Sequence, residues 1–407
     1  MAGEQDKQLA RVVTPNMLAV YSLATILGAG IYVVIGEIAG EAGYLAPLAF
    51  LFAAIAAGFS ALSYAELGAR FPQSGGSAVY IDTAFGQRWL TWITAWAVIA
   101  AGLVSSATIT TGFAGYLMAF LPIPPNVSIP LLLIALTTIA AIGIKESIWF
   151  MLICTGAGLL GLVIVLFVAG DNVINYPERA VSGLGDGTGW AMGVLLGSFL
   201  AFYAFIGFED LVTLGEEVQD VKRSLPRAII IAMGVSLFFY CAVALVAVST
   251  LSPDALAATS APLVEVMRAS GYDGSFLAIL GLLVIVDGAL AQIVMAARVI
   301  HDLGKRRGGA PAWLAAVNAK TRTPIMATFF SGAVVLLLAM FFPTGTLAGA
   351  TSFITLCVFV LINAALIRLK LTGRASGDDI ASYPLLVPVA GLLFSLVLLT
   401  AQLSVAG

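Results

Sequence analysis

Two glycine-bearing interruptions of long apolar segments are the features of this sequence whose residue types and spacing could do chemistry. The first is Gly28-Ala29-Gly30, inside the apolar stretch 22–40, and the second covers Phe205 to Phe208. A helix that unwinds inside a membrane exposes N–H groups at the start of one half-helix and carbonyl groups at the end of the other. In hydrocarbon such groups must find partners. The two interruptions therefore predict ligand-binding sites.

The polarity of the two breaks suits a zwitterion. The N–H groups of Gly30 and Ile31, at the positive end of a half-helix dipole, suit a carboxylate. The carbonyl groups of Tyr203 to Ile206, at the end of another half-helix, suit an ammonium group. An α-amino acid carries both. Close helix packing by small residues is the competing interpretation of the glycines. A dinucleotide fingerprint is disfavoured, because GAGIYV has no preceding strand and no third glycine.

Composition places the chain in a membrane. Hydrophobic residues make up 60% of the 407 positions and charged residues 10%, against roughly 25% charged in a soluble domain. A net charge of -3 with one histidine argues against nucleic-acid binding. An all-α polytopic fold is expected, with eleven apolar stretches long enough to cross ~30 Å of hydrocarbon. These are residues 14–40, 45–70, 89–120, 128–144, 147–169, 189–218, 225–249, 274–301, 324–342, 346–370 and 384–405.

The positions of Lys and Arg predict the orientation. With a cytoplasmic N terminus, 17 of the 19 fall on the cytoplasmic side, and Arg179 and Arg268 fall outside. The C terminus is then expected to be external. Residues 1–13 read as a cytoplasmic segment, not a signal peptide. The outer segment 251–273 is expected to form short helices at the outer mouth, and the inner segment 72–86 to dip into the protein.

Spacing of the breaks predicts an internal repeat. The second interrupted segment begins five spans after the first. Because five is odd, the second set of five spans is expected to lie inverted in the membrane relative to the first set. The expected organisation is a five-helix repeat at 14–169, an extracellular loop at 170–188, an inverted repeat at 189–370, and a cytoplasmic loop with an eleventh helix at 371–407. Helices 1 and 6 are expected to be discontinuous.

Several segments resemble the amino acid–polyamine–organocation superfamily, particularly its cationic amino acid transporter-like branch. They are GAGIYVVIGEIAG, YAELGARFPQSGGSAVYIDTAFGQ, FYAFIGFEDLVTLGEEVQDVKRSLPRAI and GTLAGATSFITLCVFVLINAALIRLK. The resemblance implies a leucine-transporter-like five-plus-five inverted repeat that works by alternating access. It implies carboxylate binding by the backbone of Gly28, Ala29, Gly30 and Ile31, and ammonium binding at Tyr203, Ala204 and Ile206 around Gly207. It also implies that the side chains of Phe205 and Phe208 close over the substrate.

Carboxylates at membrane depth are costly and are functional candidates. Asp287, in the middle of the eighth span, is expected either to carry a proton or bind a basic group, or to pair within the bundle. Glu209 and Asp210 follow the second break, where helix capping competes with proton or substrate binding. Glu37 could line an external vestibule, and Glu66 is expected to pair with Arg70, four residues on.

Hydroxyl side chains are weaker candidates for the pathway. Bonds back to their own helix are the commoner arrangement for such groups. The candidates are Ser105, Ser106, Thr108, Thr110, Thr351 and Ser352.

The sequence thus predicts an amino acid permease of a bacterial-type plasma membrane, working by proton symport or exchange. An organic amine or polyamine transporter of the same fold is the alternative, and a channel or intramembrane enzyme is disfavoured because no catalytic motif is found. No cofactor, metal or nucleic-acid partner is expected. Sodium coupling is disfavoured, since the eighth span lacks the Thr/Ser pair of sodium-coupled relatives. Some proton-coupled relatives carry a lysine in the fifth span. The matching position in this sequence falls near Gly158, so that lysine is absent.

Overall fold

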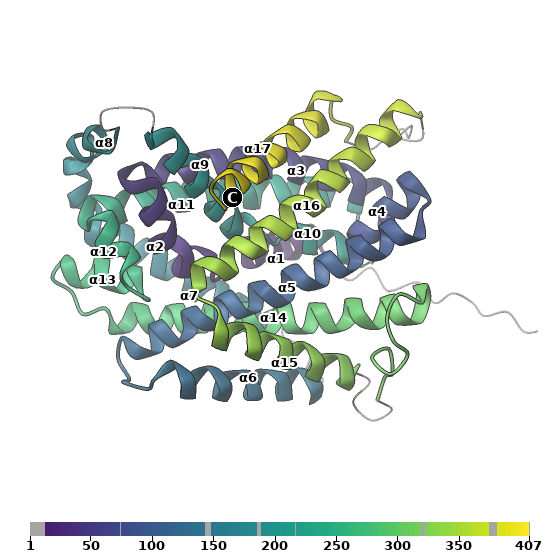
Figure 1. The fold of residues 1–407 in the computed structure, drawn as a ribbon, viewed down its shortest axis with the longest axis horizontal. Helices are drawn as coiled ribbons and strands as arrows, with labels where there is room; N and C mark the ends of the chain where they lie inside the picture. Colours follow the sequence, from purple (N-terminus) through teal and green to yellow (C-terminus); the bar gives the residue numbers. More distant parts are fainter. Residues whose placement is uncertain are drawn as a thin grey trace, which may run out of the picture.

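The computed structural model describes residues 13–73, 75–142, 148–184, 189–215, 217–318, 321, 323–373 and 381–406. Over these residues the chain is helical, and the only β pairing is an isolated bridge between Val13 and Val218. The long helices run roughly side by side (Figure 1). They are α1 (Pro15–Ile26), α2 (Gly30–Ala42), α3 (Ala46–Arg70), α5 (Arg88–Met118), α6 (Pro125–Ile142), α7 (Ile148–Ala169), α9 (Gly189–Phe202), α11 (Val221–Thr250), α14 (Ser275–Arg307), α15 (Ile325–Phe341), α16 (Thr344–Leu371) and α17 (Leu386–Ala406).

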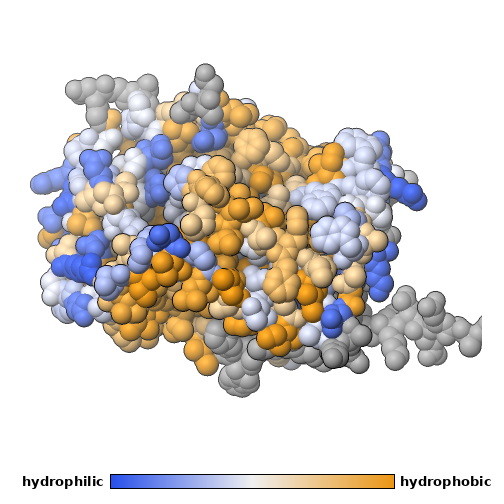
Figure 2. Space-filling view, turned by 60° about the horizontal axis from the view of Figure 1, so that its bottom comes forward, coloured by the Kyte–Doolittle hydropathy of each residue, from blue (hydrophilic) through white to orange (hydrophobic). Residues whose placement is uncertain are grey.

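Nine helical segments of the described chain are long and apolar enough to cross a membrane, and α15 is a shorter apolar helix. The first segment, Pro15–Arg70, has 56 residues, about 84 Å at ~1.5 Å per residue, which is more than two crossings require. Apolar side chains cover the middle of the face shown in Figure 2, and hydrophilic ones gather toward its left and right ends. Phe167 on α7 is 85% exposed, as a lipid-facing side chain is. The protein is an integral membrane protein.

Both predicted discontinuities are present. The first apolar stretch divides into α1 and α2, with residues 27–29 outside either helix. The second divides into α9, a 3-10 turn at Tyr203–Phe205, the short α10 (Phe208–Leu211) and a 3-10 turn at Val212–Leu214. The unbroken helices begin and end close to the predicted limits. The predicted end of the fourth span at residue 144 lies outside the described residues.

Short helices occupy the two ends of the bundle. At one end, α12 (Pro253–Ala257) and α13 (Pro262–Ala269) form the helices expected in the segment 251–273. At the other end, α4 (Gly76–Phe85) packs on α5 and α16, with Tyr80 and Ile81 fully buried, as expected for a segment that dips into the protein. The segment predicted as an extracellular loop contains short helices within its described residues, a 3-10 helix at Gly170–Asn175 followed by α8 (Tyr176–Leu184).

Helix packing follows a repeated pattern. The helix α5 packs along α14, α3 along α11, and α6 along α15. In addition, α1 and α7 contact each other, as do α9 and α16. The first three contacts each join a helix of the first predicted five-span half to the helix at the same position in the second half. The contact of α9 with α16 in the second half repeats the contact of α1 with α7 in the first half.

A buried carboxylate joins three helices at the α4 end. The side chain of Glu66 on α3 is fully buried, and its Oε1 lies 2.7 Å from Nη2 of Arg70 and 2.6 Å from Nζ of Lys370 on α16. Its Oε2 accepts a bond from the backbone N–H of Tyr383 at 3.0 Å, just before α17. The predicted pairing of Glu66 with Arg70 is therefore confirmed, and it extends to the last helix.

We expect Glu66→Ala to lower the stability of the protein strongly. The substitution leaves Arg70 and Lys370 as nearly buried charges without their shared partner, a change that typically costs roughly 3–5 kcal/mol. The matched control is Glu265→Ala, which removes the exposed pair with Arg268 at 2.6 Å and should cost about 1 kcal/mol or less. The measurement is the thermal unfolding midpoint in detergent. Equal shifts for the two variants would show that the Glu66 cluster does not hold the three helices together.

Candidate functional site

The first break leaves a helix N-terminus without a side-chain cap. Ala29 occupies the capping position of α2, and no side chain accepts a bond from the first turn. Gly28, Ala29 and Gly30 line a cavity, whereas Ile31 is fully buried. The N–H groups of the first turn of a helix have no intrahelical acceptor. This N-terminus therefore has N–H groups of the kind that can bind an anion.

The second break is a tight reversal around one glycine. Gly207 has φ of +129°, a conformation that side chains rarely adopt. A Cβ at this position would lie 2.6 Å from the carbonyl oxygen of Thr25 on α1. Tyr203, Ala204 and Ile206 line the cavity. Glycine is thus required both by the backbone conformation and by the close approach of α1.

The two breaks touch each other. A Cβ on Gly30 would lie 2.9 Å from Cα of Ala204. Close helix packing, the competing interpretation of the glycines, is therefore part of the answer for Gly30. Gly28 differs, because a Cβ there would meet only the carbonyl oxygens of Ala24 and Thr25, at 3.4 and 3.7 Å.

One tyrosine hydroxyl joins the carbonyl ends of both breaks. Tyr240 on α11 is fully buried, and its hydroxyl donates to the carbonyl oxygen of Ile26, the last residue of α1, and to that of Ala204 at 3.0 Å. The carbonyl oxygen of Tyr203 accepts the N–H of Ile206 at 3.2 Å. Of the carbonyl groups predicted to bind an ammonium, those of Tyr203 and Ala204 thus already accept one bond from the protein.

The cavity at the breaks has a volume of about 1110 Å³ and extends along one face of α14 toward the α4 end of the molecule. Its lining there includes Pro72, Gln73, Gly75 and His301, on the side that the Lys and Arg distribution predicts to be cytoplasmic. At the opposite end, α12 and α13 pack against α2, and Ser260 between them lies against α5. A Cβ on Gly36 would collide with the carbonyl of Leu256, and one on Gly115 with Ser260.

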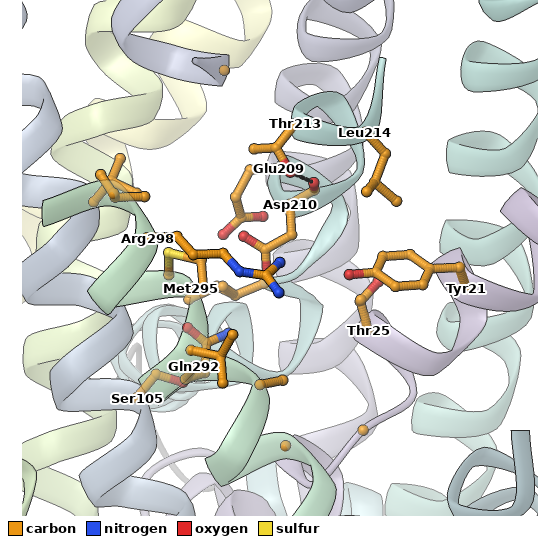
Figure 3. Close-up of a pocket in the computed structure, with 18 of the residues that line it drawn as sticks. Tyr21, Thr25, Ser105, Glu209, Asp210, Thr213, Leu214, Gln292, Met295 and Arg298 are labelled. Carbon is orange, nitrogen blue, oxygen red and sulfur yellow. Dashed lines mark hydrogen bonds between the residues drawn. The ribbon is translucent and has the colours of Figure 1, made fainter. Parts of the chain in front are cut away.

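The three predicted carboxylates come together in this cavity. Asp287, Glu209 and Asp210 all line it and are half-buried. Glu209 also accepts the N–H of Gly207 through Oε2 at 2.8 Å. Glu209 therefore caps the break, and its side chain also faces the cavity (Figure 3).

The hydroxyl candidates separate into one cavity residue and several structural ones. Ser105 lines the cavity, with its hydroxyl 3.3 Å from that of Tyr203. Ser106 donates to the carbonyl of Ala289 on α14 at 3.1 Å. Hydroxyls that bond back to their own helix belong to Thr108, Thr110 and Thr351. Ser352 is buried away from the cavity lining.

Three predicted positions lie away from the cavity. Glu37 packs against Gly345 at the start of α16, not in a vestibule continuous with the cavity. Phe205 packs against Phe50 and Tyr240, and Phe208 against Tyr64 and Phe359. Neither phenylalanine closes over the cavity in this conformation, because the 3-10 turn and the reversal at Gly207 direct both rings into the helix bundle.

Sequence reasoning missed Arg298, which it assigned to the cytoplasmic charge. The side chain lines the cavity, and Figure 3 shows its guanidinium pointing toward Asp210 and Glu209. A signal was available: Arg298 is eleven residues after Asp287, so at ~100° per residue both lie on nearly the same face of α14. Tyr21 and Thr25, one turn apart on α1, also point into the cavity (Figure 3).

Comparison with known proteins agrees with this architecture. The sequence model of the amino acid permease family matches residues 17–406. The chain belongs to the amino acid permease family. An uncharacterized transporter of Mycobacterium tuberculosis is 32% identical over 389 residues, covering 93% of this chain and 83% of that protein.

The names of two further relatives state the kind of amino acid that they transport. A cationic amino acid transporter of Arabidopsis thaliana is 29% identical and covers 89% of this chain and 63% of its own length. The branched-chain amino acid permease BcaP of Bacillus subtilis is 28% identical, and the match covers 91% of this chain and 83% of that protein. The family assignment confirms the predicted membership of the amino acid–polyamine–organocation superfamily and the function as an amino acid transporter.

We expect Gly28→Leu to block transport while leaving the fold intact. The new side chain enters the cavity without displacing another helix, and it should lower uptake about tenfold or more, equivalent to at least about 1.4 kcal/mol of lost binding. Gly30→Leu should instead lower thermal stability as well, since it forces the two breaks apart. The control is Gly156→Leu, at an exposed position of α7 with open space around it. Normal uptake by Gly28→Leu would remove the first break from the substrate site.

We expect Tyr240→Phe to destabilise the protein by roughly 1–3 kcal/mol, because it removes the donor to two buried carbonyl groups at the breaks. The measurement is again the thermal midpoint in detergent. Tyr272→Phe, at a side chain that is 57% exposed, is the control and should be neutral. If both variants unfold at the wild-type temperature, the hydroxyl of Tyr240 is not needed to hold the breaks.

Proposed function

We propose that this permease is a secondary transporter that moves a cationic amino acid by alternating access. The observation that carries the proposal is the pair of touching helix breaks at the closed end of a cavity. The uncapped N-terminus of α2 supplies donors for the α-carboxylate. Across from it, the carbonyl groups at Tyr203 to Ile206 supply acceptors for the α-ammonium.

The proposed cycle uses an inverted repeat of five plus five helices with an additional eleventh helix. The paired packing of α5 with α14, α3 with α11 and α6 with α15 supports an internal two-fold relation. Because the cavity reaches the α4 end while α12 packs closely on α2 and Ser260 on α5, we assign this conformation to the inward-facing state. The N terminus is then cytoplasmic, and the membrane is the plasma membrane of the bacterial type.

Charge favours a cationic side chain. Among the described residues that line the cavity, five are carboxylates and Arg298 is the only lysine or arginine. A cleft with an excess of one sign of charge attracts ligands of the opposite sign. The name of the Arabidopsis relative points the same way. The name of BcaP favours a branched-chain substrate, and an organic amine or polyamine remains the second candidate because the same carboxylates suit it.

A proton is the proposed coupling ion, with exchange as the other mode. Asp287 lies one residue before Gly288, whose added Cβ would be 3.8 Å from Cβ of Ala29 in the first break. A proton on Asp287 would therefore change the charge beside the carboxylate site. Gly158, near the position where some relatives carry a lysine, also faces this break. A Cβ at Gly158 would lie 3.8 Å from the carbonyl oxygen of Leu27.

The test is uptake of radiolabelled substrates by purified protein in liposomes. We expect lysine or arginine to be taken up faster than leucine, cadaverine to be a poor substrate because it lacks a carboxylate, and an inward proton gradient to increase accumulation. A sodium gradient should have no effect. Faster accumulation of cadaverine than of lysine would favour the amine transporter, and preference for leucine would overturn the cationic assignment.

A further inference from the structure

Arg298 is an unusual residue in the cavity because its charge has no fixed partner. Its side chain is exposed to the cavity, and within the part of the chain that the structure describes its guanidinium forms no ion pair or hydrogen bond. Two other arginines are anchored by contrast: Arg70 binds Glu66, and Arg179 donates to the carbonyl groups of Val248 and Leu251. The Arg298 side chain is therefore available for a partner that this conformation does not provide.

Two carboxylates face the guanidinium across the cavity. Figure 3 shows the side chains of Glu209 and Asp210 pointing into the space that the guanidinium enters from α14. Arg298 is eleven residues beyond Asp287, about 16 Å along the helix at ~1.5 Å per residue. It thus lies between the breaks and the open end of the cavity. An inward movement of α14 or of the segment after Gly207 would bring the charges together.

Closing the cavity creates an electrostatic problem. When α4 and the inner ends of α10 and α14 close, Glu209 and Asp210 lose contact with water, and unpaired buried carboxylates cost several kcal/mol each. With a cationic amino acid bound, its side chain can neutralise them. Without substrate, Arg298 is the only lysine or arginine among the described cavity-lining residues that can do so.

We propose that Arg298 is a placeholder cation, which pairs with Glu209 and Asp210 when the carrier closes without substrate and is kept from them by the side chain of a cationic substrate when one is bound. This inference rests on the proposed function. It assigns to Arg298 the step in which the empty carrier reorients, and hence net transport as distinct from exchange. It also makes Arg298 a competitor of the substrate cation, so that it limits affinity for cationic side chains.

The test compares net uptake with exchange in proteoliposomes. Net uptake is measured as lysine entry into vesicles without internal substrate, and exchange as labelled lysine entry into vesicles loaded with unlabelled lysine. For Arg298→Met we expect exchange to be retained and net uptake to fall about tenfold or more, which corresponds to at least about 1.4 kcal/mol. The KM for lysine in exchange should fall, while the KM for leucine should change little. Arg298→Lys should restore net uptake.

The matched control is Arg227→Met, which removes an exposed charge of α11 outside the cavity lining and should change neither rate. Equal loss of both rates in Arg298→Met, with a normal thermal midpoint, would overturn the proposal, and so would unchanged net uptake. If Arg298→Met is not recovered as folded protein, Arg298→Gln serves with the same expectations. Absence of lysine flux in the wild type would instead contradict the proposed function itself, so the two failures are distinguishable.

Discussion

The main physical constraint on this structure is that a helix broken inside hydrocarbon must find partners for its exposed backbone groups. The hydroxyl of Tyr240 supplies such a partner. One side chain from α11 reaches the last carbonyl of α1 and the carbonyl of Ala204. An O–H group carries a single proton, so it serves the two oxygens by sharing or alternation. Either arrangement holds the two breaks at one depth. The proposed substrate site depends on this alignment.

The backbone groups exposed at the breaks differ in how many hydrogen bonds they receive from the protein. Their carbonyl ends are largely satisfied from within, by Tyr240 and by the N–H of Ile206, and the reversal at Gly207 is capped by Glu209. The N-terminus of α2 has no side-chain cap. The free N–H donors therefore lie where the proposed function places the substrate carboxylate. The proposed ammonium group would instead share oxygens that already accept a bond.

Sequence patterns predicted most of the architecture and about half of the site. The breaks, the helix ends and the cavity position of Asp287, Glu209 and Asp210 follow from local composition, because apolar length and glycine position act along the chain. The orientation of Phe205 and Phe208 could not be predicted, since it depends on a φ of +129° at Gly207. Tyr240 was missed because its partners are 214 and 36 residues away. Arg298 was missed because Lys and Arg near helix ends were counted as loop charge.

The two ends of the cavity differ in the groups that face each other, because backbone packs closely at the α12–α13 end and charged side chains line the open α4 end. At the α12–α13 end, the seal is made by backbone lying directly on Gly36 and Gly115. Such contacts gain dispersion energy without burying charge, so they can separate at modest cost. At the other end the facing groups are charged, namely Glu209 and Asp210 opposite Arg298. Under the proposed alternating access, closure of that end has to compensate the desolvation of those charges, and the proposal assigns this compensation to Arg298 or to a cationic substrate.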